Sequence, residues 1–437
     1  IYNMTTVNYD HIFASLLKEM PGNEIAEDDL RRRGFLAVTT LDPVKDRIYK
    51  HTCLNRSQAH LLTDDRYKRF DNFIQVAEET GVIERRGNTL IKKAAMLKLP
   101  EFHNARVENP VAVIANEVEP LGELQKAIQA LAKKTPRQIQ KETATNLIKK
   151  ADFEFEIDYT NFFIQSESRK KNVGRPFLLR GNPGATGIFL IHGYMAAPLE
   201  IRGLAQYLNN LGHTVYGVRL KGHGTAPTDL AIREYEDWIL SVEESYIIIN
   251  NICDNVIAGG FSMGAGLALE LASRVTGLDA AVAISPPLKL QDFSARFVPG
   301  LNLWNRLMKR INRNKNQKEF VENNPENPHI NYTRNPLSGI RELGKLMEKT
   351  ESQLTNITTP TLIIQSHADP VVKARGAQKI FEKISSIHKE YLLVNYNRHG
   401  IVNGDQSERI FTAVGNFIER VILAKTEQRE KESNAPA

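Results

Sequence analysis

Residues 256–272, which read VIAGGFSMGAGLALELA, decide the fold. The first five are apolar or glycine, which is typical of a buried strand, and the last eight have helical character. Between them, residues 260–264 fit the pattern G-x-S-x-G. A serine on a sharp strand-to-helix turn needs small neighbours, because bulkier ones would clash there. The N-terminus of the following helix also favours developing negative charge. The stretch therefore predicts a nucleophile elbow with Ser262 at its tip.

Short apolar runs alternate with helical patterns on both sides of this stretch. Several runs are apolar throughout, which indicates parallel strands covered by helices on both faces. They span residues 188–191, 214–220, 255–260, 280–284, 361–365 and 391–394. We expect a doubly wound α/β domain with a mostly parallel sheet over residues 151–425. At its start, Phe153, Phe155 and Ile157 alternate with acids, which predicts a strand that pairs with a second one over residues 159–165.

An acid and a histidine follow two later strands, in the order that a hydrolase triad requires. Asp369 comes 107 residues after Ser262, and His399 comes 30 residues after Asp369. In this arrangement His399 accepts the serine proton, while Asp369 sets the imidazole tautomer and stabilises the imidazolium. Asp405 is a rival acid, but it follows the histidine in the chain, so Asp369 is preferred.

The predicted chemistry also needs two backbone N–H donors for a tetrahedral oxyanion. Met263, directly after the serine, supplies one of them. The loop after an early strand, residues 191–194, offers the N–H of Tyr194 as the second, and His192 is interpreted as a structural member of that turn. Because water completes the reaction of such a serine enzyme, we expect neither a metal nor an organic cofactor.

Three motifs together resemble the α/β-hydrolase superfamily: the His-Gly-Tyr turn at 192–194, RLKGHGT at 219–225, and GFSMG at 260–264. Within it, the chain is similar to bacterial monoacylglycerol lipases and carboxylesterases, including lysophospholipase-like members, over residues 186–424. The resemblance implies a triad of Ser262, Asp369 and His399. It also implies oxyanion-hole amides at Tyr194 and Met263, and an acyl ester or lipid as substrate.

Residues 286–354 lie where this family places a lid. An apolar lid would cover an acyl pocket, although the same side chains could instead pack onto the core. The apolar residues are Phe293, Phe297, Val298, Leu301, Leu303, Trp304, Leu307 and Met308.

The chain begins with a region of different character. Residues 1–119 predict a small, mainly helical domain, and residues 120–150 a helical linker. Residues 10–20 and 65–80 both place apolar side chains at helical spacing, and residues 82–91 follow as a two-stranded turn. Helices followed by a basic hairpin resemble a winged-helix-like module. At the other end of the chain, residues 426–437 are expected to form a disordered tail.

The first 119 residues also resemble the region that follows the catalytic domain of bacterial glycerol-3-phosphate acyltransferases. An acyltransferase needs an H-x-x-x-x-D pair, and His60 and Asp65 are the one match. That pair opens a predicted helix, and no Pro-Glu-Gly motif follows it, so acyltransferase chemistry is not assigned. Because residue 1 is Ile, the chain is expected to be a processed product or part of a larger lipid-modifying polypeptide.

The composition of the chain excludes several classes of protein. With 41% apolar and 25% charged residues the chain is globular rather than disordered, and two cysteines exclude a four-cysteine zinc site. No apolar run approaches bilayer length, so we expect a cytoplasmic, soluble or membrane-peripheral protein. Its net charge of +6 and the basic runs at 31–33, 133–134 and 169–171 suit docking on anionic lipid.

Two other function classes stay open. A thioesterase or acyl-transferring hydrolase would use the same triad with a different acyl donor or acceptor. A non-catalytic interaction or nucleic-acid-binding protein could retain the scaffold, and Arg85 and Arg86 on the predicted wing would then contact DNA. The modest net charge makes nucleic acid the less favoured partner.

Overall fold

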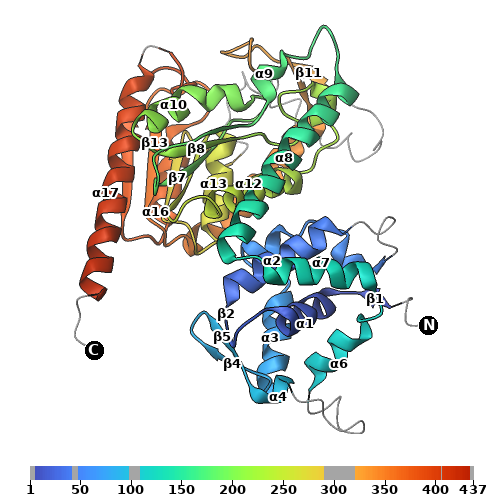
Figure 1. Cartoon of the computed structure of the whole chain (residues 1–437). Helices are drawn as coiled ribbons and strands as arrows, with labels where there is room; N and C mark the ends of the chain where they lie inside the picture. Colours follow the sequence, from blue (N-terminus) through green and yellow to red (C-terminus); the bar gives the residue numbers. More distant parts are fainter. Residues whose placement is uncertain (1–4, 42–47, 98–108, 290–319, 405, 434–437) are drawn as a thin grey trace. The chain divides into compact units, whose positions relative to one another are not determined.

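The computed structural model describes residues 5–41, 48–97, 109–289, 320–404 and 406–433. The chain divides into two compact units, residues 1–146 and 147–437. The boundary falls inside one long helix, α8 (Pro136–Phe162) (Figure 1). Within the described ranges, no helix combines the length and the apolar character that crossing a bilayer demands.

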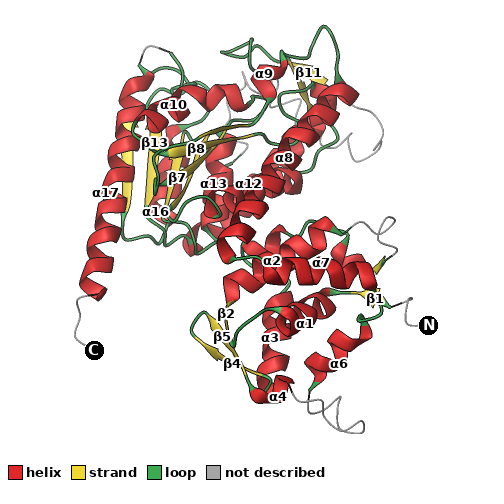
Figure 2. Cartoon of the chain, viewed as in Figure 1, coloured by secondary structure: helices red, strands yellow, loops and turns green. Residues whose placement is uncertain are grey.

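A seven-stranded sheet forms the centre of the second unit (Figure 2). The strand order is β14-β13-β10-β9-β7-β8-β6, and every pair of neighbours is parallel except β6 with β8. This confirms the predicted α/β class and all six predicted core strands. Their bounds are β6 (Phe177–Leu179), β7 (Gly187–Ile191), β8 (Thr214–Val218), β9 (Val256–Phe261), β10 (Ala280–Ile284), β13 (Thr361–Ser366) and β14 (Lys389–Val394).

Parallel pairing brings the carboxyl ends of the strands to one edge of the sheet. Ile191, the last residue of β7, pairs with Gly260 of β9, and Phe261 of β9 pairs with Ile284 of β10. Ser366 at the end of β13 pairs with Val394 at the end of β14. The loops that follow β7, β9, β13 and β14 therefore leave the sheet on the same side, where ligands bind in open α/β folds.

Helices cover both faces of this sheet (Figure 1). On one face, α10 and α17 contact each other and share a buried apolar cluster with residues of β7 and β8. On the other face, α13 packs against α12 and α15, and α16 packs against β13 and β14. The bounds are α10 (Arg202–Asn210), α12 (Tyr235–Asn250), α13 (Met263–Ala272), α15 (Leu337–Gln353), α16 (Ala374–Lys383) and α17 (Ser407–Ser433).

The strands predicted for residues 153–157 and 159–165 are wrong, because α8 continues as a helix to Phe162. The alternation of Phe153, Phe155 and Ile157 imitates a strand, but only Phe155 is buried, while Phe153 is 66% exposed. No glycine and no second proline occurs between Pro136 and Phe162 to interrupt the helix. The alternation therefore does not mark one face of a sheet.

The disordered tail predicted from residue 426 is also wrong as far as Ser433, where α17 ends. The segment AKTEQREKE, residues 424–432, is rich in strong helix formers and lacks Gly and Pro, so it extends the helix although most of its side chains as far as Lys431 are exposed. Residues 434–437 lie outside the described ranges.

The first unit is built around α1 (Tyr9–Glu19), which contacts four other helices. An antiparallel sheet of order β2-β5-β4 completes the unit. The helices and the hairpin predicted from residues 10–20, 65–80 and 82–91 are confirmed. The bounds are α2 (Glu27–Thr40), α3 (Arg69–Glu79), α6 (Pro110–Glu117), α7 (Gly122–Lys133), β2 (Glu24–Ala26), β4 (Ile83–Arg86) and β5 (Thr89–Lys92).

Residues 120–150, expected as a linker, are helical but are not a separate connector. The apolar stripe Leu124, Ile128 and Leu131 of α7 is buried in the core of the first unit. We therefore propose the boundary between the units at residues 146 and 147, within α8, rather than at residue 150.

The predicted lid is described only in part. All of its named apolar residues, from Phe293 to Met308, lie outside the described ranges. The described part forms the short antiparallel pair β11 (Phe320–Glu322) and β12 (Arg334–Pro336), followed by α15.

Candidate active site

Ser262 occupies a strained position between β9 and α13. Its φ of 54° lies in the left-handed region, which non-glycine residues rarely adopt. A Cβ on Gly260 would overlap the carbonyl of Gly264, and one on Gly264 would overlap the carbonyl of Ile191. The two glycines therefore let the strand, the turn and the helix approach closely enough to hold the serine at the tip of the turn.

The structure brings together the three side chains predicted from the sequence. The Nε2 atom of His399 lies 3.0 Å from Oγ of Ser262, and its Nδ1 atom lies 2.7 Å from Oδ2 of Asp369. The Asp369 side chain is fully buried. Its Oδ1 atom accepts hydrogen bonds from the backbone N–H groups of Val371 at 2.8 Å and Val372 at 2.9 Å. The acid is thus locked in place behind the histidine.

Neighbouring charges favour the protonated form of His399. Burial alone would lower the pKa of its imidazole, but the carboxylates of Asp369, Glu326 and Glu200 outweigh burial, and the pKa is raised above its ordinary value.

Asp405, the rival acid, lies outside the described residues.

The two residues predicted to supply oxyanion-hole amides lie at the site of the serine, one next to it in the chain and one in the wall of its cavity. Met263 is the first residue of α13, and Tyr194 lines the same cavity as Ser262. The hydroxyl of Tyr194 donates to Oδ1 of Asn335 at 3.0 Å, and its buried ring packs edge-on against Trp238. The loop after β7 is therefore held by the tyrosine side chain as well as by its backbone.

His192 is a buried member of that turn, as the sequence indicated. Burial lowers the pKa of its imidazole to about 4, so the ring is neutral at physiological pH. Its Nε2 atom accepts from the N–H of Leu220 at 3.3 Å, which leaves Nδ1 to donate to the carbonyl of Gly193 at 2.8 Å.

Sequence reasoning missed two acidic residues at this site. Glu200, in the short helix η4 (Pro198–Ile201), is 4% exposed and accepts from the N–H of Gly193 at 2.7 Å. Glu326 accepts from the backbone N–H groups of His399 at 3.2 Å and Gly400 at 2.8 Å. Neither residue belongs to a sequence motif. The one signal that could have indicated a buried acid at Glu200 is its position among apolar residues at 196–201.

A cavity of about 140 Å³ opens at Ser262. Its lining includes polar residues of the segment after β11 and also Phe261, Pro370 and Val371. The polar residues are Asn323, Asn324, Glu326, Asn327 and Asn331. Hydroxyl-bearing and apolar parts of one ligand could therefore both be accommodated next to the serine.

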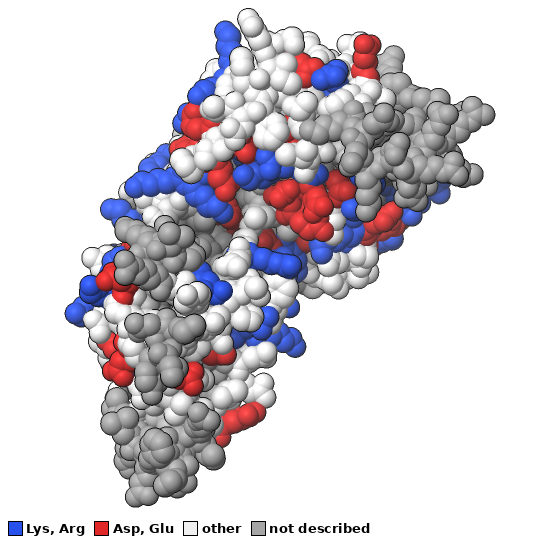
Figure 3. Space-filling view, turned by 90° about the vertical axis from the view of Figure 1, so that its right-hand side faces the viewer, with Lys and Arg blue, Asp and Glu red and all other residues white. Residues whose placement is uncertain are grey.

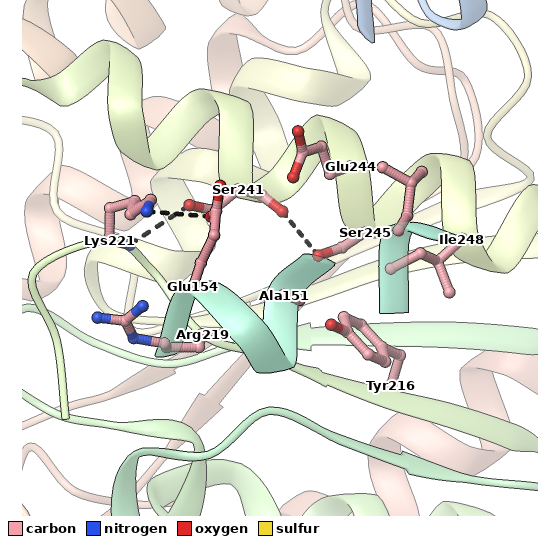
Figure 4. Close-up of a pocket in the computed structure, with 10 residues that line it drawn as sticks. Ala151, Glu154, Tyr216, Arg219, Lys221, Ser241, Glu244, Ser245 and Ile248 are labelled. Atoms are coloured by element: carbon pink, nitrogen blue, oxygen red, sulfur yellow. Dashed lines mark hydrogen bonds and ion pairs between the residues drawn. The ribbon is translucent and has the colours of Figure 1, made fainter. Parts of the chain in front are cut away.

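A second cavity, of about 30 Å³, lies beneath α8 and shares no lining residue with the first (Figure 4). In Figure 4, Lys221 points toward Glu154, and their charged groups are 3.0 Å apart. The volume suits about one water molecule. We interpret it as part of the ionic contact that holds α8 on the α/β core.

The His60–Asp65 pair is structural. Nδ1 of His60 lies 3.5 Å from Oδ1 of Asp65, and both side chains are buried. Asp65 also accepts from the N–H groups of Arg69 at 3.2 Å and Phe70 at 3.1 Å, which caps the start of α3. The geometry therefore explains the spacing without acyltransferase chemistry.

Basic residues are largely matched by acids on this chain. Arg31, Arg32 and Arg33 each form an ion pair within the first unit, and Arg33 is buried. Arg85 of the hairpin pairs with Glu27. On the face shown in Figure 3, blue and red side chains are interspersed and form no continuous basic field.

Cys53 and Cys253 are both free thiols. Over the described residues, no set of three or more His, Cys, Asp or Glu side chains is arranged to hold a metal ion.

Comparison with known proteins places this site in a family. Residues 183–406 match the family Hydrolase_4, described as serine aminopeptidase, S33. The chain is 32% identical over 227 residues to the thermostable monoacylglycerol lipase of Bacillus sp. strain H-257, covering 51% of this chain and 86% of that protein. It is 22% identical over 251 residues to a carboxylesterase of Bacillus subtilis strain 168, covering 56% of this chain and 97% of that protein.

Among solved structures, the chain is similar to one described with LipS and LipT, two metagenome-derived lipolytic enzymes. The TM-score is 0.50 at 24% sequence identity, over 56% of this chain and 97% of that one. This likeness bears on the fold alone, and it agrees with the α/β architecture of the second unit.

Proposed function

The chain belongs to the Hydrolase_4 family of α/β-hydrolases and is a carboxylic ester hydrolase, and we propose that it cleaves acyl lipids of the monoacylglycerol or lysophospholipid type. The catalytic triad in this proposal is Ser262, His399 and Asp369. The observation that carries it is the chain of contacts from Asp369 through His399 to Ser262, with spacings of 2.7 Å and 3.0 Å.

The proposed reaction begins when Ser262 Oγ attacks the ester carbonyl and its proton moves to Nε2 of His399. The N–H groups of Tyr194 and Met263 hold the tetrahedral oxyanion. Collapse expels the alcohol, which takes the proton from His399 and leaves an acyl-enzyme. Water, activated by the same histidine, then releases the fatty acid and restores the serine. Asp369 keeps the imidazole in the tautomer that both steps need.

The mixed polar and apolar lining of the cavity supports the proposed substrate class. The amides of Asn323, Asn327 and Asn331 and the carboxylate of Glu326 could hydrogen-bond to the hydroxyl groups of a polyol head. Phe261 and Val371 offer apolar surface beside the serine. A glycerol ester with one acyl chain combines both kinds of group.

We also propose peripheral contact with an anionic membrane, where such lipids reside. The side chains of Phe153 and Phe163 are 66% and 52% exposed, and the basic segment 169–171, in which Lys170 and Lys171 are exposed, follows Phe163 in the chain. Exposed aromatic and basic side chains together favour the lipid–water interface. Co-sedimentation with vesicles of phosphatidylglycerol, compared with phosphatidylcholine, tests this, and equal sedimentation with both would contradict it.

The primary test is labelling by a fluorophosphonate probe, which needs an activated serine but no assumed substrate. Wild type and Ser352→Ala, which removes an exposed serine of α15, should be labelled equally, and Ser262→Ala should not be labelled. A panel of monoacylglycerols, lysophospholipids and acyl thioesters should follow. Faster turnover of thioesters would favour the thioesterase alternative, and absence of labelling in wild type would exclude the proposed triad.

A further inference from the structure

Glu200 is a buried acid in the wall of the catalytic cavity, and the proposed reaction does not use it. It is 4% exposed and lines the same cavity as Ser262 and His399. Burying a carboxyl group away from water is unfavourable unless its oxygens find partners. The partner that Glu200 finds is the backbone N–H of Gly193, at 2.7 Å.

Gly193 lies in the loop after β7, directly before Tyr194, whose N–H is proposed to bind the oxyanion. A Cβ placed there would lie 3.1 Å from Oε2 of Glu200 and 3.4 Å from Cβ of Ser262, so the glycine lies between the acid and the nucleophile. The carbonyl of Gly193 and the N–H of Tyr194 belong to one planar peptide group. Fixing Gly193 therefore fixes the direction of the Tyr194 N–H.

Two buried side chains hold Gly193 from its two ends. Glu200 accepts from its N–H, and neutral His192 donates to its carbonyl at 2.8 Å. The histidine can act as this donor because the N–H of Leu220 occupies its other nitrogen. The oxyanion is a transient species, and hydrogen-bond donors stabilise it most when they are already oriented before it forms. A fixed orientation of the Tyr194 N–H therefore matters for the rate.

The charge of Glu200 also reaches His399. Three carboxylates face this imidazole: Asp369 after β13, Glu326 after β11, and Glu200 in η4, and all three raise its pKa. Burial raises the pKa of Glu200 itself to about 7, although the Gly193 hydrogen bond and His399 act in the opposite direction. Ionised Glu200 therefore supports the imidazolium that forms when the serine is deprotonated.

We propose that Glu200 is a positioning residue that orients the Tyr194 amide through Gly193 and stabilises positive charge on His399. This inference rests on the proposed function. It requires that Glu200 act mainly when ionised, since a carboxylate accepts hydrogen bonds more strongly than a neutral carboxyl group.

Two variants of the full chain test the proposal. Glu200→Ala removes both the acceptor and the charge, whereas Glu200→Gln keeps an acceptor for Gly193 and removes only the charge. Glu342→Gln is the matched control, because Glu342 is also buried, at 5% exposed, but pairs with Lys345 on α15 and does not line the cavity. For each protein, kcat and KM for p-nitrophenyl butyrate are measured from about pH 5 to 9, a range that spans the ordinary pKa of histidine, together with fluorophosphonate labelling and circular dichroism.

We expect Glu200→Ala to lower kcat by roughly tenfold or more with KM changed less than about threefold, because only transition-state stabilisation is lost. At high pH Glu200→Gln should lose less kcat than Glu200→Ala, because it keeps the acceptor for Gly193 and lacks only the charge. It should also move the acid limb of kcat/KM to lower pH by at least roughly 0.3 unit, because loss of a negative charge lowers the pKa of His399. The control should match wild type.

The proposal is overturned if the acid limb of kcat/KM has the same midpoint in Glu200→Gln as in wild type. It is also overturned if Glu200→Ala folds and its kcat equals that of wild type. If Glu200→Ala does not fold, the pH profile of Glu200→Gln decides alone. Failure of the proposed function can be distinguished from failure of this inference, because wild type itself would then be neither labelled at Ser262 nor active. In that case the proposed role of Glu200 would be excluded as well.

Discussion

Asp369 and His399 follow adjacent strands, β13 and β14, and meet with 2.7 Å between Oδ2 and Nδ1 although 30 residues separate them in the chain. Parallel pairing of the two strands brings their carboxyl ends together, and two backbone N–H groups hold the other carboxylate oxygen. The acid is therefore an orienting group for the histidine.

Replacing Asp369 with Asn should abolish most activity without unfolding the protein. Two backbone N–H groups donate to the Oδ1 position, so the Asn amide would place its oxygen there and turn its NH2 toward Nδ1 of His399. Nδ1 would then have to accept, and the ring proton would sit on Nε2, the wrong tautomer for taking the proton of Ser262. We expect kcat to fall roughly 10³- to 10⁴-fold, as for triads of this type. Asp254→Asn, at an exposed position, is the control. Hydrolysis rates measure the effect, and a loss below roughly tenfold would contradict the assigned role.

The pH profile should show an acid limb set by protonation of His399, to which protonation of Glu200 contributes. The base must be neutral to accept the serine proton, and its pKa is raised above the ordinary value of about 6.5. Activity should therefore fall as the pH decreases through a midpoint above about 6.5. Glu326→Gln should move this midpoint to lower pH, because one carboxylate is removed. A midpoint near about 5 in the wild-type kcat/KM profile would be inconsistent with the three carboxylates around the ring.

Two glycines of α13 should respond in opposite ways to alanine. Gly264→Ala would force a Cβ into the carbonyl of Ile191, whereas a Cβ on Gly266 would meet no atom within 4 Å. We expect Gly264→Ala to lose labelling of Ser262 and several kcal/mol of stability, about 3 or more. Gly266→Ala should be neutral or more stable by about 0.5–1 kcal/mol. Thermal melting and probe labelling of both variants distinguish the cases.

Breaking the ion pairs of Asp158 should loosen α8 from the α/β core. Asp158 lies 2.8 Å from Arg219 and 3.1 Å from Arg233, with 9% of its side chain exposed. Asp158→Asn removes the carboxylate that Arg219 and Arg233 share, although both keep Asp229 as a partner, so the loss should cost about 1.5–3 kcal/mol.

A matched control is Asp152→Asn, since Asp152 is 44% exposed and pairs with Arg175 at 3.3 Å. That exposed pair should contribute at most about 1 kcal/mol. Urea unfolding followed by tryptophan fluorescence reports on the second unit alone, because both tryptophans, Trp238 and Trp304, belong to it. Equal midpoints for the two variants would contradict the proposed role of Asp158.

The pattern of apolar residues along the chain predicted the secondary structure correctly where a segment is buried over its whole length. The buried strands β7, β9 and β10 are continuous apolar runs, and the elbow combines glycines with a strand and a helix on either side. Pattern failed at residues 153–157, where the alternation of three apolar residues suggested a strand. There Phe155 packs against Arg219, which lies far along the chain, whereas Phe153 and Ile157 are exposed.

The order of the strands' apolar runs, the nucleophile turn at Ser262, and the succession of serine, acid and histidine could be predicted from the amino-acid pattern. Each of these depends on residues that are close in the chain or on a fixed order. The position of Glu200 and Glu326 beside His399, and the packing of α8 on the α/β core as a helix, became visible only in the folded chain. Those contacts connect residues up to 199 positions apart (His399 and Glu200), and neither periodicity nor spacing specifies which distant side chains meet when the chain folds.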